Sequence, residues 1–253
     1  MIDAHAHLDD RRFAGDLDAV LARASAAGIE RVLSCAEDLA SSERSVLIAR
    51  RHAAVRVAVG VHPHRAESWS DAVSAMVDRL ARDQHVVAIG EIGIDLSGRS
   101  APRDAQETAF LAQLALAKRL GLPVVVHVRD AGPLARELVD RAGVSRGMVH
   151  CFSEGPDEVD EWMRRGFMVS FAGPVTYPKN EALRRAAARV AADRILLETD
   201  APYLASQARR GERNEPAFVL DALLAVAAAR REDPAELGRQ VAENAQKLFG
   251  DRF

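Results

Sequence analysis

The chain has 253 residues, of which 48% are hydrophobic and 28% charged, as in an ordinary folded protein with an ample core. A net charge of −3 excludes a protein that holds nucleic acid by overall electrostatic attraction, so a nucleic-acid substrate must be met locally. No apolar run reaches the ~20 residues of a membrane span, and the start of the chain does not resemble a signal peptide. Cys35 and Cys151 form no disulfide framework, so we expect a cytoplasmic protein. The sequence does not indicate an obligate protein partner.

Short apolar runs alternate with longer amphipathic runs along the whole chain. The expected strands cover residues 1–4, 31–35, 55–61, 86–89, 123–126, 147–149, 167–171 and 194–197. The expected helices between and after them include residues 16–27, 41–52, 71–82, 103–120, 182–191 and a last helix that begins after Asp233. This alternation predicts a parallel sheet with helices outside. Eight such units in 253 residues predict one α/β domain over residues 1–253, a (β/α)8 TIM barrel.

His5 and His7 stand at the end of the first expected strand. Because successive strand side chains alternate between faces, both imidazoles point the same way. Two imidazoles on one face at a strand end form half of a metal site. A strand with two hydrogen-bonded histidines is the alternative interpretation, and the later strand ends decide between the two.

Polar residues also follow the later apolar runs. They are His62 after the third run, Glu91 after the fourth, His127 after the fifth, His150 after the sixth and Asp200 after the eighth. In a (β/α)8 barrel these positions share the C-terminal mouth, where active sites lie. Carboxylates that close apolar runs are costly to bury unless they are paired or metal-bound. The residues therefore predict a mouth with enough ligands for two divalent cations, with Glu91 placed to bridge them.

The chain resembles the TatD-type metal-dependent hydrolases of the amidohydrolase superfamily from residue 1 to about residue 250. The motifs that carry the resemblance cover residues 3–8, 60–64, 90–95, 127–131, 150–153, 197–204 and 213–216. Two loops depart from the family pattern, because no aromatic residue follows Asp95 and Glu154 stands where a glycine is usual.

The resemblance implies the ligands. One metal is expected on His5, His7, Glu91 and Asp200, and the other on Glu91, His127 and His150. Members of the family are divalent-metal-dependent nucleases acting on DNA, and some relatives deacylate aminoacyl-tRNA. Imidazole-rich sites suit Zn, Mn, Fe or Ni better than Mg, although excess Mg can support activity. Two divalent cations are therefore expected, with their identity open.

The expected reaction is cleavage of a DNA phosphodiester bond by a hydroxide that the two metals activate. Asp200 is the candidate catalytic residue that orients the attacking water and takes its proton; a purely ligating role remains open. Arg129 shares a strand face with His127 and is expected to hold a phosphate, or else to pair with Asp130 or Glu198. His62, His64 and Arg213 are further candidates for substrate contact. Cys151, on the strand face opposite His150, is expected to be buried packing.

Two other functions stay open. The same metal pair can polarise a carbonyl and hydrolyse an ester, a lactone or an amide, including the ester of an aminoacyl-tRNA. A metal-binding protein without catalysis is the third possibility. The absence of a basic stripe favours single-stranded DNA or strand ends as the substrate of a nuclease.

Overall fold

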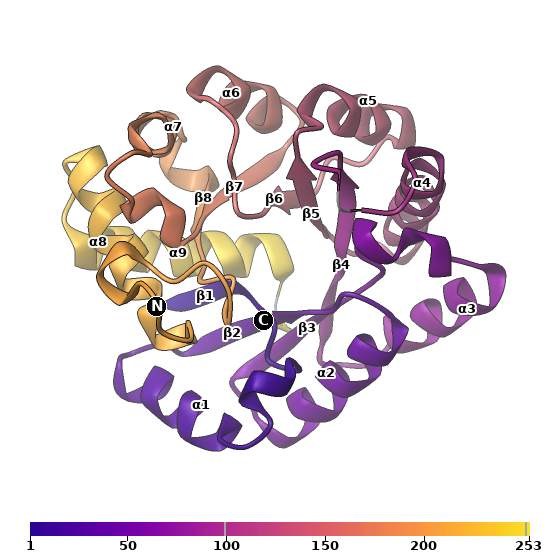
Figure 1. Ribbon diagram of the computed structural model, residues 1–253, viewed down its shortest axis with the longest axis horizontal. Helices are drawn as coiled ribbons and strands as arrows, with labels where there is room; N and C mark the ends of the chain where they lie inside the picture. Colours follow the sequence, from indigo (N-terminus) through magenta and orange to yellow (C-terminus); the bar gives the residue numbers. More distant parts are fainter. Residues whose placement is uncertain (99, 251) are drawn as a thin grey trace.

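The computed structural model describes residues 1–98, 100–250 and 252–253. Its sheet has eight parallel strands in the sequential order β1 to β8. The strands are β1 (Ile2–Ala6), β2 (Arg31–Cys35), β3 (Val55–Val59), β4 (Val86–Asp95), β5 (Val124–Arg129), β6 (Gly147–Val149), β7 (Phe167–Phe171) and β8 (Ile195–Leu197). Figure 1 shows these strands around a common centre with helices outside them. The (β/α)8 barrel expected from the sequence is confirmed.

The barrel closes where the end of β8 meets β1. The backbone N–H of Asp200 donates to the carbonyl of His5 at 2.9 Å, and the N–H of His7 donates to the carbonyl of Ala201 at 2.7 Å. Ala6 and Ala201 form an isolated parallel bridge at the same point. The closure therefore brings the first and last functional segments of the chain together.

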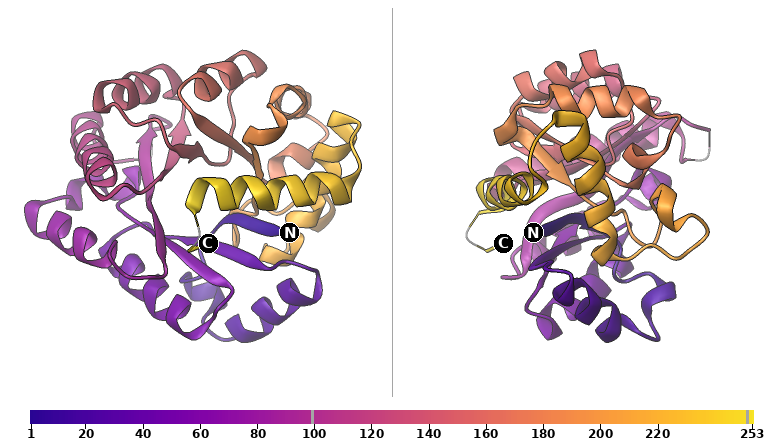
Figure 2. Two further views of the ribbon diagram at one scale, coloured as in Figure 1. Left: turned by 180° about the vertical axis from the view of Figure 1, so that it is seen from behind. Right: turned by 90° about the vertical axis from the view of Figure 1, so that its left-hand side faces the viewer.

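Helices follow the strands and cover the outside of the barrel. They are α1 (Leu17–Ala26), α2 (Leu39–Arg51), α3 (Asp71–Leu80), α4 (Arg103–Leu120), α5 (Gly132–Ala142), α6 (Pro156–Arg164), α7 (Glu181–Arg189), α8 (Val219–Arg230) and α9 (Pro234–Phe249). Asp233 caps α9 by accepting from the N–H groups of Ala235 and Glu236, as the sequence predicts. Figure 2 shows α9 across the back of the barrel, where the Asn244 amide donates to the carbonyl of Ile195 at 2.8 Å.

Strand β4 is longer than the sequence indicates. It continues for six residues beyond Ile89, and all ten of its residues are buried. This extension of β4 requires a glycine at position 93. A Cβ there would lie 1.9 Å from the carbonyl oxygen of His127 on β5, so any other residue would clash. The two strands thus approach closely at the level of the site.

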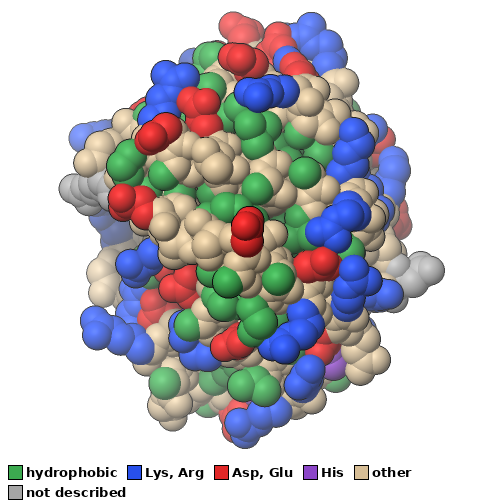
Figure 3. All heavy atoms as spheres, turned by 90° about the vertical axis from the view of Figure 1, so that its right-hand side faces the viewer, with side chains coloured by type: hydrophobic (Ala, Val, Ile, Leu, Met, Phe, Trp, Pro, Cys, Tyr) green, Lys and Arg blue, Asp and Glu red, His purple; other side chains and the backbone are tan. Residues whose placement is uncertain are grey.

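The outer surface carries charges of both signs. Figure 3 shows basic and acidic side chains next to one another over the face drawn there. Among the described residues, no helix combines the length and the apolar character needed to cross a membrane.

Candidate metal centre

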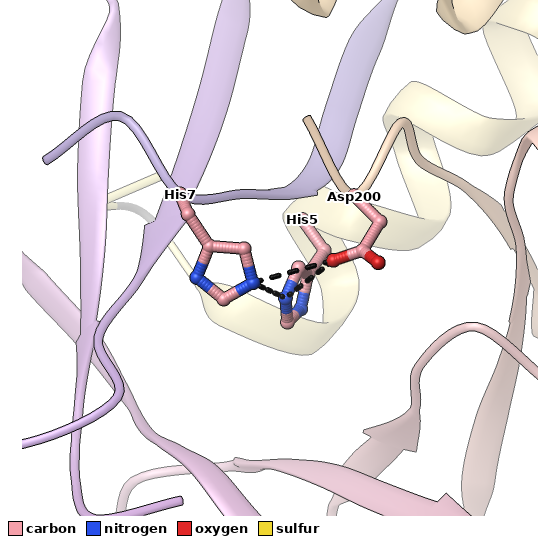
Figure 4. A group of neighbouring side chains, drawn as sticks. All are labelled: His5, His7 and Asp200. Carbon is pink, nitrogen blue, oxygen red and sulfur yellow. Dashed lines mark hydrogen bonds and ion pairs between the residues drawn. The ribbon is translucent and has the colours of Figure 1, made fainter. Parts of the chain in front are cut away.

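The first group of donors joins the two ends of the barrel. His5 and His7 come from β1 and its C-terminal end, and Asp200 comes from the turn after β8; Figure 4 shows the three side chains pointing toward one another. The Nε2 atoms of the two histidines are 3.3 Å apart. Asp200 Oδ1 lies 3.6 Å from His5 Nε2 and 3.3 Å from His7 Nε2. All three residues are buried.

Glu91 connects this group to a second one. Its Oε2 lies 3.3 Å from His5 Nε2 and 3.6 Å from His7 Nε2. Its Oε1 lies 2.8 Å from His127 Nδ1 and 2.7 Å from His150 Nε2. One carboxylate thus presents each of its oxygens to a different pair of imidazoles, as a bridging ligand must.

The donor spacing fits a metal ion. A tetrahedral ion with ligand bonds of about 2.1 Å separates its ligand atoms by about 3.4 Å. In the first group, the Nε2 atoms of His5 and His7 lie 3.3 Å from each other and 3.3–3.6 Å from the facing oxygens of Asp200 and Glu91. The second group, with 3.2 Å between His127 Nδ1 and His150 Nε2, supplies two imidazoles and a carboxylate oxygen. Both groups therefore fit divalent cations in donor type, and the first also fits in spacing.

The far ring nitrogens of three histidines are held by acceptors. His7 Nδ1 lies 2.9 Å from the carbonyl oxygen of Cys35. His150 Nδ1 lies 3.2 Å from Glu198 Oε1, and His127 Nε2 lies 3.3 Å from Asp95 Oδ2. Such acceptors fix the tautomer and the orientation of a ligating imidazole. Glu198 therefore orients His150.

His62 lies in the same cluster but its hydrogen bonding sets it apart. Its Nε2 is 3.3 Å from Glu91 Oε1, while its Nδ1 accepts from the backbone N–H of His64 at 3.1 Å. Burial lowers the pKa of His62 to about 4, so the ring is neutral near pH 7. Since Nδ1 accepts, the single ring proton is on Nε2. His62 is thus arranged to donate a hydrogen bond into the site.

Opposite charges inside the cluster shift its titration. Burial alone would lower the pKa of His7, but the Asp200 hydrogen bond and the charge of Glu91 raise it to about 10. Burial alone would raise the pKa of Glu91, but the imidazoles of His150, His62 and His5 hold it well below its usual range. Without metal the site therefore keeps Glu91 and Asp200 ionised and favours protons on His7, His127 and His150, whereas burial lowers the pKa of His5 and of His62.

A cavity of about 490 Å³ lies over these groups. Besides the donors, it is lined by side chains that include Glu37, His64, Arg129, Cys151, Pro174, Tyr203 and Leu204. Arg129 is exposed and forms no ion pair with a described residue. His64 Nε2 lies 3.0 Å from Asp95 Oδ2. The structure thus brings Arg129, His62 and His64 to the cavity with the expected metal ligands.

Arg213 is not brought to the cavity. Its guanidinium pairs with Asp16 at 2.7 Å and with Glu215 at 2.8 Å, and it lies 4.9 Å from the centroid of the Phe13 ring. These contacts tie the loop after β8 to the start of α1. The guanidinium of Arg213 is therefore held by acidic partners away from the cavity lining, and its contact with substrate stays a prediction.

The loop after β6 changes the expectation for Cys151 and explains what Glu154 does. Cys151 lines the cavity rather than packing behind it, because its backbone adopts a φ of +43° and strand alternation ends at His150. Glu154 does not line the cavity and accepts from Arg136 at 2.9 Å and from the Trp162 indole at 2.7 Å. The departure from the family pattern at Glu154 therefore serves the packing of α5 and α6.

Sequence reasoning missed three acidic residues of the site. Asp95 holds His127, Glu37 lines the cavity, and Asp3 accepts from the Thr199 hydroxyl through Oδ2 and from the Thr199 N–H at 2.9 Å. Burial raises the pKa of Asp3 to about 8. Strand alternation could have identified two of them, because strand residues separated by an even number of positions share a face. Asp3 precedes His5 by two residues, and Asp95 follows Glu91 by four.

The fold and this donor set define a TIM-barrel protein whose C-terminal mouth carries His, Glu and Asp groups able to hold metal ions. A model of the family described as TatD related DNase matches residues 2–250. The chain belongs to this family.

Relatives match over nearly the whole chain. The chain is 38% identical to a protein of Cronobacter sakazakii named "3'-5' ssDNA/RNA exonuclease TatD", over 98% of this chain and 97% of that protein. It is 32% identical to the "Uncharacterized metal-dependent hydrolase YabD" of Bacillus subtilis, with 98% of each covered. The crystal structure of YJJV, a TatD homologue from Escherichia coli, superposes with a TM-score of 0.94 at 30% identity, covering 98% of this chain and 97% of that one.

Proposed function

We propose that residues 1–253 act as one metal-dependent exonuclease domain that removes nucleotides from the 3′ end of single-stranded DNA or RNA. The observation that carries the proposal is the Glu91 carboxylate, whose two oxygens face two separate groups of imidazoles. Relatives named as 3′-5′ exonucleases on single strands support the substrate and the polarity. The cytoplasmic location expected from the sequence belongs to the same proposal.

The proposed ligands fall into two sets that share Glu91. His5, His7 and Asp200 would hold one divalent cation with Glu91 Oε2, and His127 and His150 would hold the other with Glu91 Oε1. When bound, such a pair lowers the pKa of water and stabilises charge on both the attacking and the leaving oxygen of a phosphodiester. The identity of the two cations stays open among Zn, Mn, Ni, Fe and Mg.

The side chains around the cluster supply positioning and proton transfer. In Figure 4 the second carboxylate oxygen of Asp200 points away from His5 and His7, which leaves it able to accept a proton from an attacking water. His62 presents an N–H beside Glu91 and would donate to a phosphoryl oxygen. Arg129, at the cavity wall without an acidic partner among the described residues, would bind a phosphate oxygen in a bidentate manner.

The test is cleavage of a 5′-fluorescent single-stranded oligonucleotide by metal-stripped protein supplied with Mn²⁺, Zn²⁺ or Mg²⁺. A product ladder that shortens from the 3′ end, lost in His127→Ala, is the expected result. Arg129→Ala should lower kcat/KM by about 100-fold, because a charge-assisted bidentate contact is lost. Arg141→Ala is the matched control, since Arg141 is exposed on α5 away from the cavity.

Failure to cleave any strand would redirect the assignment. Turnover of an aminoacyl ester or a lactone that is insensitive to Arg129→Ala would favour the carbonyl hydrolase. Two bound cations without turnover of either substrate class would favour a metal-binding protein that does not catalyse.

A further inference from the structure

Glu37 lines the cavity but takes no part in the metal-facing clusters described above. It lies two residues beyond β2 and directly precedes Asp38, which caps α2. Its backbone is fixed beside the site: its carbonyl accepts from the N–H of His62 at 2.9 Å, and the neighbouring carbonyl of Ala36 accepts from the N–H of Glu91 at 3.0 Å. The side chain is therefore held at the mouth next to the bridging carboxylate.

The carboxylate of Glu37 has no hydrogen-bond or ion-pair partner among residues 1–98, 100–250 and 252–253. By contrast, Glu91, Asp95 and Asp200 each face at least two imidazole nitrogens. A half-buried carboxylate without a donor is costly, so its position favours a ligand that brings one. Cations on Glu91 and Asp200 would offset their charges and leave Glu37 as an uncompensated negative charge at the wall.

A rigid aromatic ring stands on the other side of His7. Tyr203 follows β8, and β8 and β2 flank β1 in the barrel. The Arg12 guanidinium covers the Tyr203 ring at 4.2 Å, the Tyr203 hydroxyl lies 3.2 Å from Asp10 Oδ2, and the ring centroid is 5.7 Å from that of His7. Leu204 beside it is 40% exposed, which extends this apolar edge of the cavity.

We propose that Glu37 and Tyr203 form the subsite for the terminal nucleoside, and that Glu37 accepts a hydrogen bond from its 3′-hydroxyl. The apolar edge at Tyr203 and Leu204 contacts the base or the sugar, as aromatic side chains do in single-strand binding. The negative charge of Glu37 repels a strand that ends in a 3′-phosphate, because like charges close together in a partly dehydrated site disfavour binding. Glu37 therefore determines which strand ends are accepted, an inference that rests on the proposed exonuclease function.

The experiment compares two 5′-fluorescent oligodeoxynucleotides that differ only in a 3′-hydroxyl or a 3′-phosphate end, with Mn²⁺ present. We expect the wild-type protein to prefer the hydroxyl end by at least about tenfold in kcat/KM, and Glu37→Gln to reduce this preference by about tenfold. The gain should come from faster use of the 3′-phosphate end, which a loss of folding cannot produce. Glu43→Gln is the matched control, because Glu43 is exposed on α2 outside the cavity lining, and it should keep the wild-type preference.

A third oligodeoxynucleotide, with a 3′-deoxy end, separates the effect of the hydrogen bond to Glu37 from the effect of its charge. The wild-type protein should bind it more weakly than the hydroxyl strand, with the difference in KM, and Glu37→Ala should abolish that difference. An unchanged preference in Glu37→Gln, with active wild-type protein, overturns this inference and leaves the exonuclease proposal standing. Wild-type protein that cleaves none of the strands with any metal overturns both.

Discussion

At the residue scale, Asp95 orients His127, one of the imidazoles that face Glu91. Its Oδ2 lies 3.3 Å from His127 Nε2 and 3.0 Å from His64 Nε2, while its Oδ1 accepts from the Ser97 N–H and hydroxyl at 2.8 and 2.6 Å. The two serine bonds fix the carboxylate, and the carboxylate fixes the imidazole. The pKa of Asp95 is held well below its usual range, although burial alone would raise it, because His127 and Ser97 hydrogen-bond to it. It therefore acts on His127 as an anion.

Asp95→Asn tests this positioning role. The amide keeps the shape but loses the charge, so His127 becomes a less basic and less ordered ligand, and affinity for metal at the Glu91–His127–His150 group should fall by about 10–100-fold. Competition against a chromogenic chelator measures the affinity directly. Asp104→Asn, on the exposed side of α4, should leave it unchanged. A loss of less than about threefold would show that His127 is oriented by its packing alone.

The sequence analysis identified site residues as the polar residues that directly follow an apolar run. This rule finds some residues of the site and misses others. Glu91, His127 and His150 follow such runs directly, and all three lie in the cluster. Asp95 escaped because Gly90 and Gly93 look like the end of a strand, whereas β4 continues through both. The ion pair of Arg213 could not be predicted from the sequence either, because its partner Asp16 lies 197 positions earlier in the chain.

At the scale of secondary-structure elements, the pairing of β4 with β5 positions several side chains of the site. Register places Gly93 opposite His127 and Asp95 opposite Arg129, so one strand pair presents Glu91, Asp95, His127 and Arg129. Alternation of apolar runs and helices predicted the barrel, because each strand and helix buries its own apolar face. The length of β4 was not predictable in the same way, because it depends on backbone contact across strands at a glycine.

Gly93→Ala should damage the fold and the site together. The added Cβ would meet the His127 carbonyl oxygen at 1.9 Å, and the backbone φ of +152° is unfavourable for alanine. We expect the free energy of unfolding to fall by about 3 kcal/mol, from overpacking and backbone strain. Urea denaturation followed by circular dichroism measures the loss.

Gly15→Ala is the control for this substitution. A Cβ at Gly15 has no atom within 4 Å, so its effect on unfolding should stay within about 0.5 kcal/mol of wild type. If Gly93→Ala were equally mild, the close approach of β4 and β5 would not be a constraint on this chain.

At the scale of the whole molecule, the proposed metal centre would tie distant strands together. Its donors come from β1, β4, β5, and from the turns after β6 and β8, including the seam where the barrel closes. Ligands that bind only the folded chain add to its stability, by about 1.4 kcal/mol for each tenfold excess over Kd. Occupancy of the centre therefore changes the stability of the barrel as a unit, and protons compete for the same histidines.

The competition makes the stabilisation by metal depend on pH in a definite direction. In metal-free protein the pKa of His7 is about 10 and that of His150 is raised well above its ordinary value, because Asp200, Glu91 and Glu198 favour the charged rings. The protonated rings stabilise the folded metal-free protein at low pH, and this contribution is lost as the pH rises toward 10. Metal binding requires neutral rings, so its apparent affinity rises by about tenfold per pH unit for each proton displaced.

The difference in melting temperature between Mn²⁺-loaded and chelator-treated protein should therefore widen steadily from pH 6 to pH 9, as followed by scanning calorimetry. Both terms act in the same direction, since rising pH strengthens the loaded form and weakens the metal-free form. His7→Ala removes a proton-binding group whose pKa is raised to about 10 and should flatten the widening, while His85→Ala, at the opposite end of the barrel before β4, should preserve it. A difference that stays constant across this range would mean that protons and metal do not compete for these histidines, and the bridging arrangement of Glu91 would then have to hold its cations without displacing a proton.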